Sequence, residues 1–373
     1  MVFEFAYSEP YYNVQVIDFP GRPSSAVVNE KTNLIYVTDF FSGKLVVIDG
    51  NSDRIIDNIN MTKTAFGVGF NTTTNMIYVG SEFANVLNVV NADTNKIEEK
   101  ISMIDPYDIA VNPNKNTIYI TSDKSHSVFV LDGDSHEMIT KFNVTKPCGI
   151  AVNSKTGMVY VTSESENLVQ VFDAENNFVT KINVGESPRG VTVNELTNMI
   201  YVANQKTDTI SVIDGSKNLV IDSVEVGDVP RRVVAHYQTN LIYVTNQGSN
   251  NISVINGSDN KVIKTIPVNE PFEIAINQNT GTLYSMYLGN TEISVIKNSD
   301  ATHDNTRSFP KSNVEKGDSS LSPLKQVQLG ILPQNVSCKD GFELVIKASN
   351  EMPACVKTSS VQKLVDIGWA SNF

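Results

Sequence analysis

The chain has 373 residues, 40% hydrophobic and 19% charged, which is the balance of a folded globular protein and excludes an intrinsically disordered chain. The formal net charge is −12. Residues 301–373 contain eight Lys or Arg and seven Asp or Glu, so the negative charge belongs to residues 1–300. This acidic body argues against binding of nucleic acid or of anionic membrane surfaces.

The N-terminal residues offer two interpretations. Residues 1–8 read MVFEFAYS, which is too short for a whole signal peptide, yet Ala6-Tyr7-Ser8 resembles the small-x-small end of one. A signal peptide cut short by a downstream start and an ordinary chain end are both compatible with this segment. No apolar run reaches the roughly 18 residues of a membrane helix, so no transmembrane segment is predicted.

From residue 12 onward the sequence repeats itself. A tyrosine within an apolar run recurs every 41 or 42 residues, at Tyr36, Tyr78, Tyr119, Tyr160, Tyr201, Tyr243 and Tyr284. A residue type that tolerates left-handed backbone precedes each run, at Asn33, Asn75, Asn116, Gly157, Asn198, Asn240 and Gly281. A polar residue that can cap the same turn stands four positions earlier, at Asn29, Asn71, Asn112, Asn153, Asn194, His236 and Asn277.

Each repeat reads as four antiparallel strands, here called a to d in chain order, with a DG- or NG-type turn between strands c and d in several repeats. Four strands in about 41 residues are typical of a propeller blade. The seventh repeat stops at Ile296 without a strand d, and residues 12–19 (YNVQVIDF) supply the missing one. The sequence therefore predicts an all-β, seven-bladed propeller over residues 1–297, closed by its N-terminal strand.

The strings LIYVTN (241–246), MIYVAN (199–204), MVYVTS (158–163) and SVIDG (211–215) resemble the YVTN family of β-propeller repeats, which are WD40-like in architecture. The resemblance covers residues 12–297 and extends to the propellers of archaeal surface-layer proteins. It departs from the family pattern in two blades, at 78–81 and 284–287. The resemblance implies a propeller and an exported location, and it implies no single activity.

The C-terminal part is predicted to be separate from the propeller. Residues 298–321 are polar and read as a linker, and residues 322–373 read as a small α+β domain. We expect a helix at 322–329, a hairpin of 342–347 and 354–357, and a helix at 361–367 that ends at Gly368, with Trp369 packed across the unit. The segment from Ser337 to Lys357 with its GWA ending resembles a short domain of exported proteins of ammonia-oxidising archaea.

The cysteines bear on the compartment. Cys338 and Cys355 lie close together in the C-terminal domain, whereas Cys148 stands alone in the propeller. The pair predicts a disulfide, which suits a small core and an oxidising compartment. The alternative is a zinc site, but two cysteines without a nearby histidine fall short of four ligands. Cys148 is expected to be a small buried hydrophobe.

No motif of an established catalytic class is present. The chain lacks a Gly-rich phosphate loop, a dinucleotide fingerprint and a GxSxG nucleophile elbow. Its four histidines are out of register between the repeats. The sequence therefore predicts no catalytic residues, no bound metal and no cofactor.

The connections between strands indicate which face of the propeller is the candidate surface for binding a ligand or partner. The a–b and c–d turns are uniform, whereas the d–a and b–c connections vary and are expected to surround one mouth of the central channel. The residues that begin strand a are read as Ser24, Ala65, Tyr107, Cys148, Arg189, Arg231 and Phe272. The residues after strand b are Asp39, Glu82, Asp123, Glu164, Gln205, Gln247 and Leu288.

These two series give an acidic arc over blades 1–4 and a basic arc over blades 5 and 6. As candidate binding residues we take Arg189, Arg231, Arg232, Tyr107, Phe272, Glu82, Asp123 and Glu164. One interpretation is that the two arcs bind a polar ligand or a charged segment of a partner. The other is that neighbouring charges neutralise one another, with Glu164 paired to Arg189.

Three functions are compatible with these patterns. The leading one is an exported or cell-surface module without enzymatic activity, which binds a protein, a glycan or a small polar ligand through the variable-loop face. The second is a propeller enzyme of the lyase or lactonase type with a site at the channel mouth, since related propellers host such enzymes, and the acidic arc would then be a candidate for divalent cations. The third is a subunit of a cell-envelope assembly.

Overall fold

The computed structural model describes residues 12–298, 336–347, 353–366 and 370–371. The chain divides into two compact units, Met1–His303 and Asp304–Phe373. The first unit is a seven-bladed β-propeller, and the predicted fold class is confirmed. Among the described residues, no helix is long and apolar enough to span a membrane.

Each blade is one four-stranded antiparallel sheet. Strands a of blades 1–7 are β2 (Pro23–Asn29), β6 (Ala65–Asn71), β10 (Ile109–Asn112), β14 (Pro147–Val152), β18 (Pro188–Asn194), β22 (Pro230–His236) and β26 (Glu273–Ile276). Strands b, next outward, are β3 (Leu34–Asp39), β7 (Met76–Ser81), β11 (Thr117–Ser122), β15 (Val159–Ser163), β19 (Met199–Asn204), β23 (Leu241–Asn246) and β27 (Leu283–Met286).

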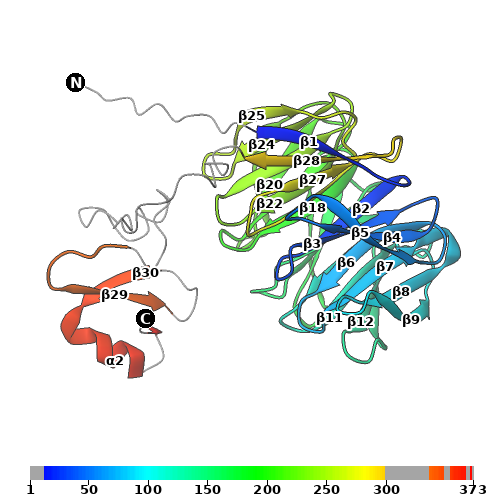
Figure 1. Ribbon diagram of the computed structural model, residues 1–373. Helices are drawn as coiled ribbons and strands as arrows, with labels where there is room; N and C mark the ends of the chain where they lie inside the picture. Colours follow the sequence, from blue (N-terminus) through cyan, green and yellow to red (C-terminus); the bar gives the residue numbers. More distant parts are fainter. Residues whose placement is uncertain (1–11, 299–335, 348–352, 367–369, 372–373) are drawn as a thin grey trace. The chain divides into compact units, whose positions relative to one another are not determined.

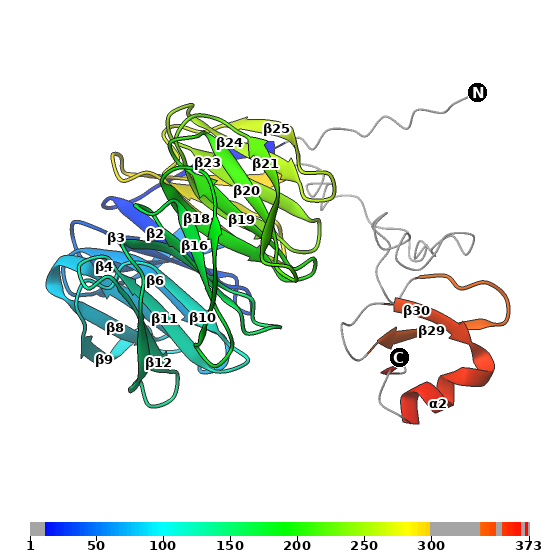
Figure 2. The same cartoon turned by 180° about the vertical axis from the view of Figure 1, so that it is seen from behind.

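The outer half of each blade follows the same order. Strands c are β4 (Lys44–Asp49), β8 (Val86–Asn91), β12 (Ser127–Asp132), β16 (Leu168–Phe172), β20 (Thr209–Asp214), β24 (Asn251–Asn256) and β28 (Glu292–Asn298). Strands d of blades 1–6 are β5 (Arg54–Asn60), β9 (Lys96–Ser102), β13 (Met138–Asn143), β17 (Phe178–Asn183), β21 (Leu219–Glu225) and β25 (Lys261–Pro267). Figure 2 shows β19, β20 and β21 of blade 5 side by side.

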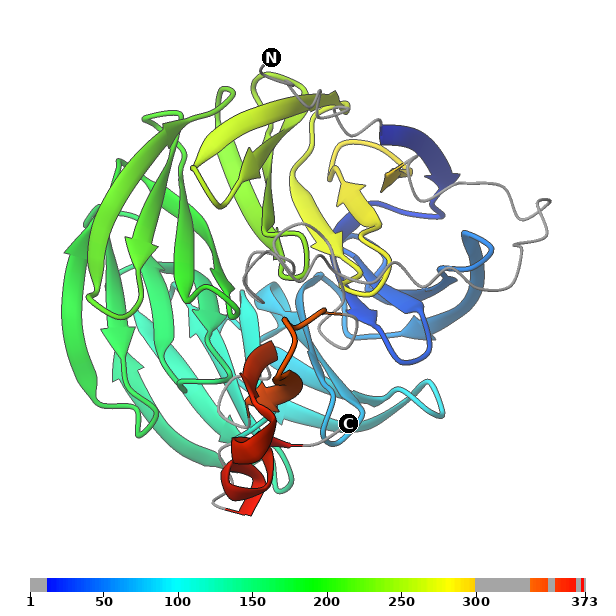
Figure 3. The same cartoon turned by 90° about the vertical axis from the view of Figure 1, so that its left-hand side faces the viewer.

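The ring closes as the sequence predicts. The N-terminal strand β1 (Tyr12–Asp18) pairs antiparallel with β28, from Tyr12 opposite Asn298 to Asp18 opposite Glu292. Figure 1 shows the blue β1 beside the gold β28, and Figure 3 shows the blades following one another in a ring. Ile17 and Phe19 are buried with residues of blades 1 and 7, so the closing strand also joins the core across the seam.

The repeated tyrosine is the central core residue of each blade. Six of the seven tyrosines are at most 1% exposed, and Tyr243 is 3% exposed. Each packs into the interface with the next blade, as Tyr36 does against Val68 and Ile77. The hydroxyl of Tyr36 donates to the Ala92 carbonyl of blade 2 at 3.2 Å, and that of Tyr78 donates to the Gly133 carbonyl of blade 3 at 3.4 Å.

The uniform turns link neighbouring blades through asparagines. All seven predicted turn residues have positive φ, between 50° and 76°. At five blade boundaries the capping asparagine donates its side-chain amide to the turn asparagine of the following blade; these pairs are Asn29–Asn75, Asn71–Asn116, Asn153–Asn198, Asn194–Asn240 and Asn277–Asn33. The last pair connects blade 7 to blade 1 at 2.7 Å. The same turn residues that shape each hairpin therefore also join neighbouring blades by hydrogen bonds.

The second unit contains a hairpin and a helix. Strand β29 (Phe342–Lys347) pairs with β30 (Pro353–Lys357) and, at its end, with β31 (Ala370–Ser371). A 3-10 turn, η4 (Thr358–Ser360), leads into α2 (Val361–Asp366). Cys338 and Cys355 form the predicted disulfide. The predicted linker at 298–321, the helix at 322–329 and Trp369 lie outside the described residues, apart from Asn298, which ends β28.

Candidate functional site

The mouth of the channel is built by the residues that begin each strand a. Three threonines at one position of strand b donate to strand a of the next blade: Thr38 to the Phe66 carbonyl, Thr121 to the Cys148 carbonyl and Thr162 to the Arg189 carbonyl. Ser24 is hydrogen-bonded to Thr38. This register places Ser24, Phe66, Tyr107, Cys148, Arg189, Arg231 and Phe272 in one ring, here called the mouth ring. The assignment of Ala65 to this ring is wrong by one residue, because Ala65 pairs with Ser81 in the position that Pro147 and Pro188 have in their blades.

One residue further along the chain lies a second ring, here called the inner ring: Ser25, Gly67, Asp108, Gly149, Gly190, Arg232 and Glu273. Glycine is required at three of its positions. A Cβ atom would lie 1.8 Å from the Tyr107 carbonyl at Gly67, 2.3 Å from the Arg189 carbonyl at Gly149 and 2.7 Å from the Arg231 carbonyl at Gly190. The strands therefore approach one another here more closely than a side chain permits.

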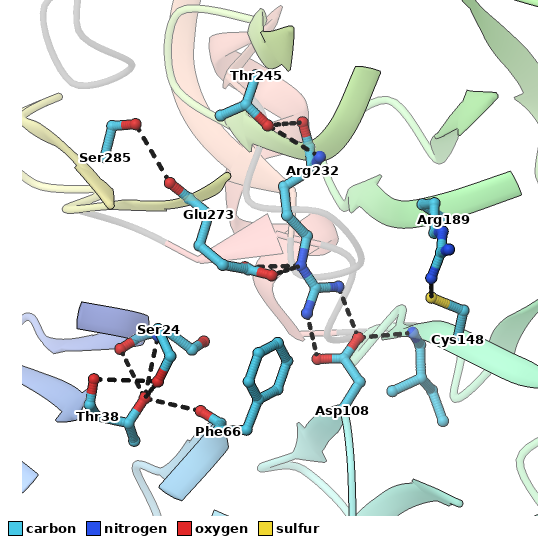
Figure 4. Close-up of polar contacts among 12 residues, drawn as sticks. Ser24, Thr38, Phe66, Asp108, Cys148, Arg189, Arg232, Thr245, Glu273 and Ser285 are labelled. Atoms are coloured by element: carbon cyan, nitrogen blue, oxygen red, sulfur yellow. Dashed lines mark hydrogen bonds and ion pairs between the residues drawn. The ribbon is translucent and has the colours of Figure 1, made fainter. Parts of the chain in front are cut away.

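Three of the other inner-ring residues, Asp108, Arg232 and Glu273, form ion pairs across the channel. Figure 4 shows Arg232 of blade 6 between Glu273 of blade 7 and Asp108 of blade 3. Its Nε lies 2.7 Å from both carboxylate oxygens of Glu273, and its Nη1 and Nη2 lie 2.8 and 2.9 Å from the Asp108 oxygens. Asp108 also accepts from the Ile150 amide at 3.1 Å. We call Asp108, Arg232 and Glu273 the triad.

The triad contains two carboxylates for one guanidinium. Burial raises the pKa of Glu273 to about 7, with the negative charge of Asp108 adding to the effect and the guanidinium of Arg232 opposing it. Those two carboxylates hold the pKa of Arg232 above its usual value despite its burial. Beyond the triad, toward the uniform turns, the channel has a cavity of about 270 Å³ lined mainly by valine, alanine and isoleucine and by Tyr237.

The predicted acidic residues gather at one side of the mouth. Glu82, Asp123 and Glu164 line a pocket of about 100 Å³ together with Asp105, Tyr107, Cys148 and Arg189. Much of its charge is compensated: Glu164 pairs with Arg189 at 2.9 Å and with Lys146 at 3.1 Å, and Asp105 pairs with Lys124 at 2.9 Å. Burial, Asp105 and Asp123 together raise the pKa of Glu82. Within the described part of the chain, no three His, Cys, Asp or Glu side chains are placed to share a metal ion.

The predicted basic residues have three different roles in the structure. Arg189 has internal partners, since it also donates to Gln205 at 3.1 Å and contacts the Cys148 sulfur at 3.7 Å. Arg232 belongs to the triad and lies across the channel. Arg231 stacks on Phe272 with its guanidinium carbon 3.8 Å from the ring centroid. The pairing of Glu164 with Arg189 that we considered is therefore formed, and the three arginines line one small pocket although each has different partners.

An aromatic surface occupies the mouth over blades 7, 1 and 2. Phe66 stacks on Tyr107 with centroids 4.9 Å apart, and it meets Phe272 and Phe40 edge to face. Phe40 in turn meets Phe41 and Phe83 edge to face, and these last two side chains are 60% and 61% exposed. We call Phe40, Phe41, Phe66, Phe83 and Phe272 the aromatic surface.

All eight predicted site residues lie around the mouth, and further residues of the site were not predicted. Asp108 and Glu273 directly follow Tyr107 and Phe272, just as Arg232 follows Arg231. Comparing the next residue of strand a in every blade would therefore have found them. Phe40, Phe41 and Phe83 lie in the variable b–c connections, where Phe41 and Phe83 hold the same position in blades 1 and 2. Only their hydrophobicity within polar loops could have marked them.

Comparison with known protein families finds a similarity over part of the propeller. The sequence model of the family described as "Lactonase, 7-bladed beta-propeller" matches residues 67–219, from β6 of blade 2 to the start of β21 in blade 5. The match covers less than half of the chain. No curated protein matches the sequence. These blades are thus similar to those of lactonase-type propellers.

Proposed function

We propose that the protein is an exported or cell-surface binding module and that its variable-loop face recognises a partner or ligand. The exposure of Phe41 and Phe83 carries this proposal. Both are large aromatic side chains in loops, and both are continuous with the aromatic surface rather than isolated. Contiguous exposed aromatic groups on a rigid scaffold are typical of interaction sites.

Three further observations support the proposal. The triad spans the channel just inside the mouth and joins blades 6, 7 and 3, which holds these parts of the face in place. The resemblance to YVTN repeats implies export, and the Cys338–Cys355 disulfide suits an oxidising compartment. The aromatic surface lies beside the acidic pocket, which gives the face both apolar contact area and charge for specificity.

A double variant tests the proposal. Fluorescently labelled wild-type protein should sediment saturably with cell envelopes of the source organism and be displaced by unlabelled protein. Phe41→Ala with Phe83→Ala should weaken this binding by about tenfold or more, because exposed aromatic anchors dominate such interfaces. Phe178→Ala removes a side chain of similar exposure (56%) from the outer strand β17 and should bind as wild type. Equal binding of all three proteins would reject the variable-loop face.

A lactonase-type enzyme is the second candidate, and two observations favour it. One is the match of residues 67–219 to the lactonase propeller family. The other is Glu273, whose pKa of about 7 suits a general base and which borders the 270 Å³ cavity next to Arg232. Against this role, both oxygens of Glu273 are bonded to Arg232. Hydrolysis of glucono-δ-lactone that Glu273→Gln abolishes would establish the enzyme, and wild-type rates equal to those of the variant would exclude it for this substrate.

A further inference from the structure

A cleft at the edge of the mouth has walls unlike those of the acidic pocket. It has a volume of about 310 Å³ and lies where blades 7 and 1 meet, with Gln247 of blade 6 at one side. Arg22 comes from the connection into β2, and Phe40 and Phe41 come from the b–c connection of blade 1. Phe272, Tyr287 and Leu288 complete it from blade 7. This volume is at the lower end of the range of small-molecule sites.

The walls of the cleft suit a flat apolar ring. Phe40 and Phe41 stand edge to face with centroids 5.1 Å apart, which fixes their relative orientation. Phe272 contacts Phe66 edge to face, and the Arg231 guanidinium stacks on its ring. Rings fixed in this way lose little conformational freedom when a second ring stacks on them.

Among the described residues that line the cleft, Arg22 is the one charged side chain. The Arg22 guanidinium lies 4.8 Å from the Phe41 centroid. Its backbone is anchored by the Asp39 side chain, which accepts from the Arg22 amide at 3.1 Å. Among the described residues, Arg22 and Arg231 form no ion pair with a carboxylate, whereas Arg189 and Arg232 are both paired. Two acidic groups lie close by: the Asp39 carboxylate accepts from the backbone amides of Arg22 and Phe41, and Glu270 interacts with the Tyr287 hydroxyl.

From this combination we propose that the cleft binds a small aromatic carboxylate, with its ring against Phe41 and Phe272 and its carboxylate on the guanidinium of Arg22. A guanidinium without a carboxylate partner offers the planar donor fork that fits a carboxylate. The net charge of −12 disfavours ligands with several negative charges, such as nucleotides. This inference rests on the proposed binding function and specifies the ligand class of one part of that surface.

Three indoles that differ mainly in the charge of the side chain test the proposal: indole-3-acetate (negative), tryptophol (neutral) and tryptamine (positive). Dissociation constants come from ligand-observed NMR titrations of the full chain. We expect indole-3-acetate to bind about fivefold tighter than tryptophol, as a partly exposed charge-assisted contact allows, and tryptamine to bind most weakly. Phe41→Leu should weaken the binding of all three indoles.

The role of Arg22 is tested by a matched pair of variants. Arg22→Gln should make indole-3-acetate and tryptophol bind equally. Arg54→Gln makes the same change of net charge at an exposed site at the start of β5, next to the c–d turn on the uniform face, and should keep the fivefold preference. Thermal melts of both variants verify that they are folded.

The outcomes separate this inference from the proposed function. A preference for indole-3-acetate that survives Arg22→Gln, tightest binding by tryptamine, or no saturable binding of any indole would each overturn the aromatic-carboxylate site. If envelope binding nevertheless depends on Phe41 and Phe83, the variable-loop face remains the interaction surface. Conversely, selective binding of indole-3-acetate without envelope binding would leave the cleft as a ligand site and reject the envelope as the partner.

Discussion

Asn112 of blade 3 holds the position of the donor asparagines in the uniform turns, but the turn residue of the following blade is Gly157, and the buried side-chain nitrogen of Asn112 has no hydrogen-bond partner among the described residues. At five other boundaries the equivalent nitrogen is bonded to an asparagine. A buried donor without a partner costs stability. The boundary between blades 3 and 4 therefore lacks a hydrogen bond that five other boundaries have, and an asparagine at residue 157 would supply its acceptor.

We predict that Gly157→Asn combined with Ala174→Gly raises the free energy of unfolding by about 1 kcal/mol, because Asn112 gains an acceptor. Asparagine tolerates the left-handed φ of +76° at residue 157. The second change is needed because a Cβ at residue 157 would lie 2.5 Å from the Ala174 Cβ. Four other blades have glycine at the position of Ala174. Urea denaturation of the variant and the wild type measures the gain.

Gly281→Asn is the matched control for this repair. At the boundary before Gly281, the capping residue is His236, whose Nε2 already lies 3.0 Å from the Gln278 carbonyl. An asparagine at residue 281 would therefore not give an unpaired donor a new acceptor. A gain of equal size in both variants would show that the effect arises from the loss of glycine flexibility and not from the new hydrogen bond.

The triad predicts a specific dependence of stability on pH. The pKa of Glu273 is about 7 in the folded protein and about 4.3 in an unfolded chain, so the folded state binds the proton more tightly. Stability from this group is therefore fully present below pH 4, falls as the pH rises to about 7 and is constant above that, with a loss of up to about 3 kcal/mol.

Glu273→Gln should remove this slope, because glutamine keeps an acceptor for Arg232 and does not ionise. The variant should match the wild type near pH 4 and be more stable at pH 8. Glu225→Gln, at an exposed position in β21, should leave the slope intact. Urea denaturation at the two pH values gives the answer, and an unchanged slope in Glu273→Gln would mean that another group titrates.

Two arginines of the mouth should differ sharply in their contribution to folding. Arg189→Gln should lower the free energy of unfolding by roughly 1–2 kcal/mol, since Glu164 would keep only Lys146 as a charged partner. Arg22→Gln should change it by less than about 0.5 kcal/mol, because Arg22 has no carboxylate partner among the described residues. Differential scanning calorimetry of both variants compares them, and similar losses would contradict the division into structural and ligand-facing arginines.

The sequence predicts the propeller in detail because the same pattern of strands and turns recurs in seven repeats. A left-handed turn residue, a capping asparagine and a core tyrosine recur with one spacing, and each follows from local backbone geometry. The closing strand was predictable by counting strands, since a blade without a strand d leaves an open edge. The register at the channel mouth was also predictable, because each mouth-ring residue precedes its repeated tyrosine by 12 positions; this spacing gives Phe66 before Tyr78, and the assignment of Ala65 departed from it.

The chemistry of the mouth was only partly predictable. Charges in the variable connections could be read from the sequence, but which carboxylate each arginine meets depends on contacts across the channel. Arg232 reaches Asp108 over a separation of 124 residues, and no local pattern reveals such a partner. The aromatic surface likewise arises from side chains of blades 7, 1 and 2 that meet in space. The function proposed for this face therefore rests on residues that differ from blade to blade.

The cysteines allow a prediction that bears on both units. Cys148 is 6% exposed, and its burial raises the pKa of its thiol even though Arg189 lies close to the sulfur. A protonated and buried thiol reacts slowly with alkylating reagents. Native protein should therefore take up no iodoacetamide within an hour, one equivalent after unfolding in guanidinium chloride, and three after unfolding with reduction. Intact-mass spectrometry counts the additions.

Reduction should also act on one unit alone. The disulfide closes a loop with a sequence separation of 17, for which the chain-entropy treatment gives about 3 kcal/mol, a large share for a unit of this size. Adding dithiothreitol should speed hydrogen exchange in β29 and β30 and leave the propeller strands unchanged. Rapid alkylation of native protein would place Cys148 in contact with solvent and make the mouth ring more open than its packing indicates. Exchange that rises in both units would show that the propeller depends on the disulfide-bonded unit for its stability.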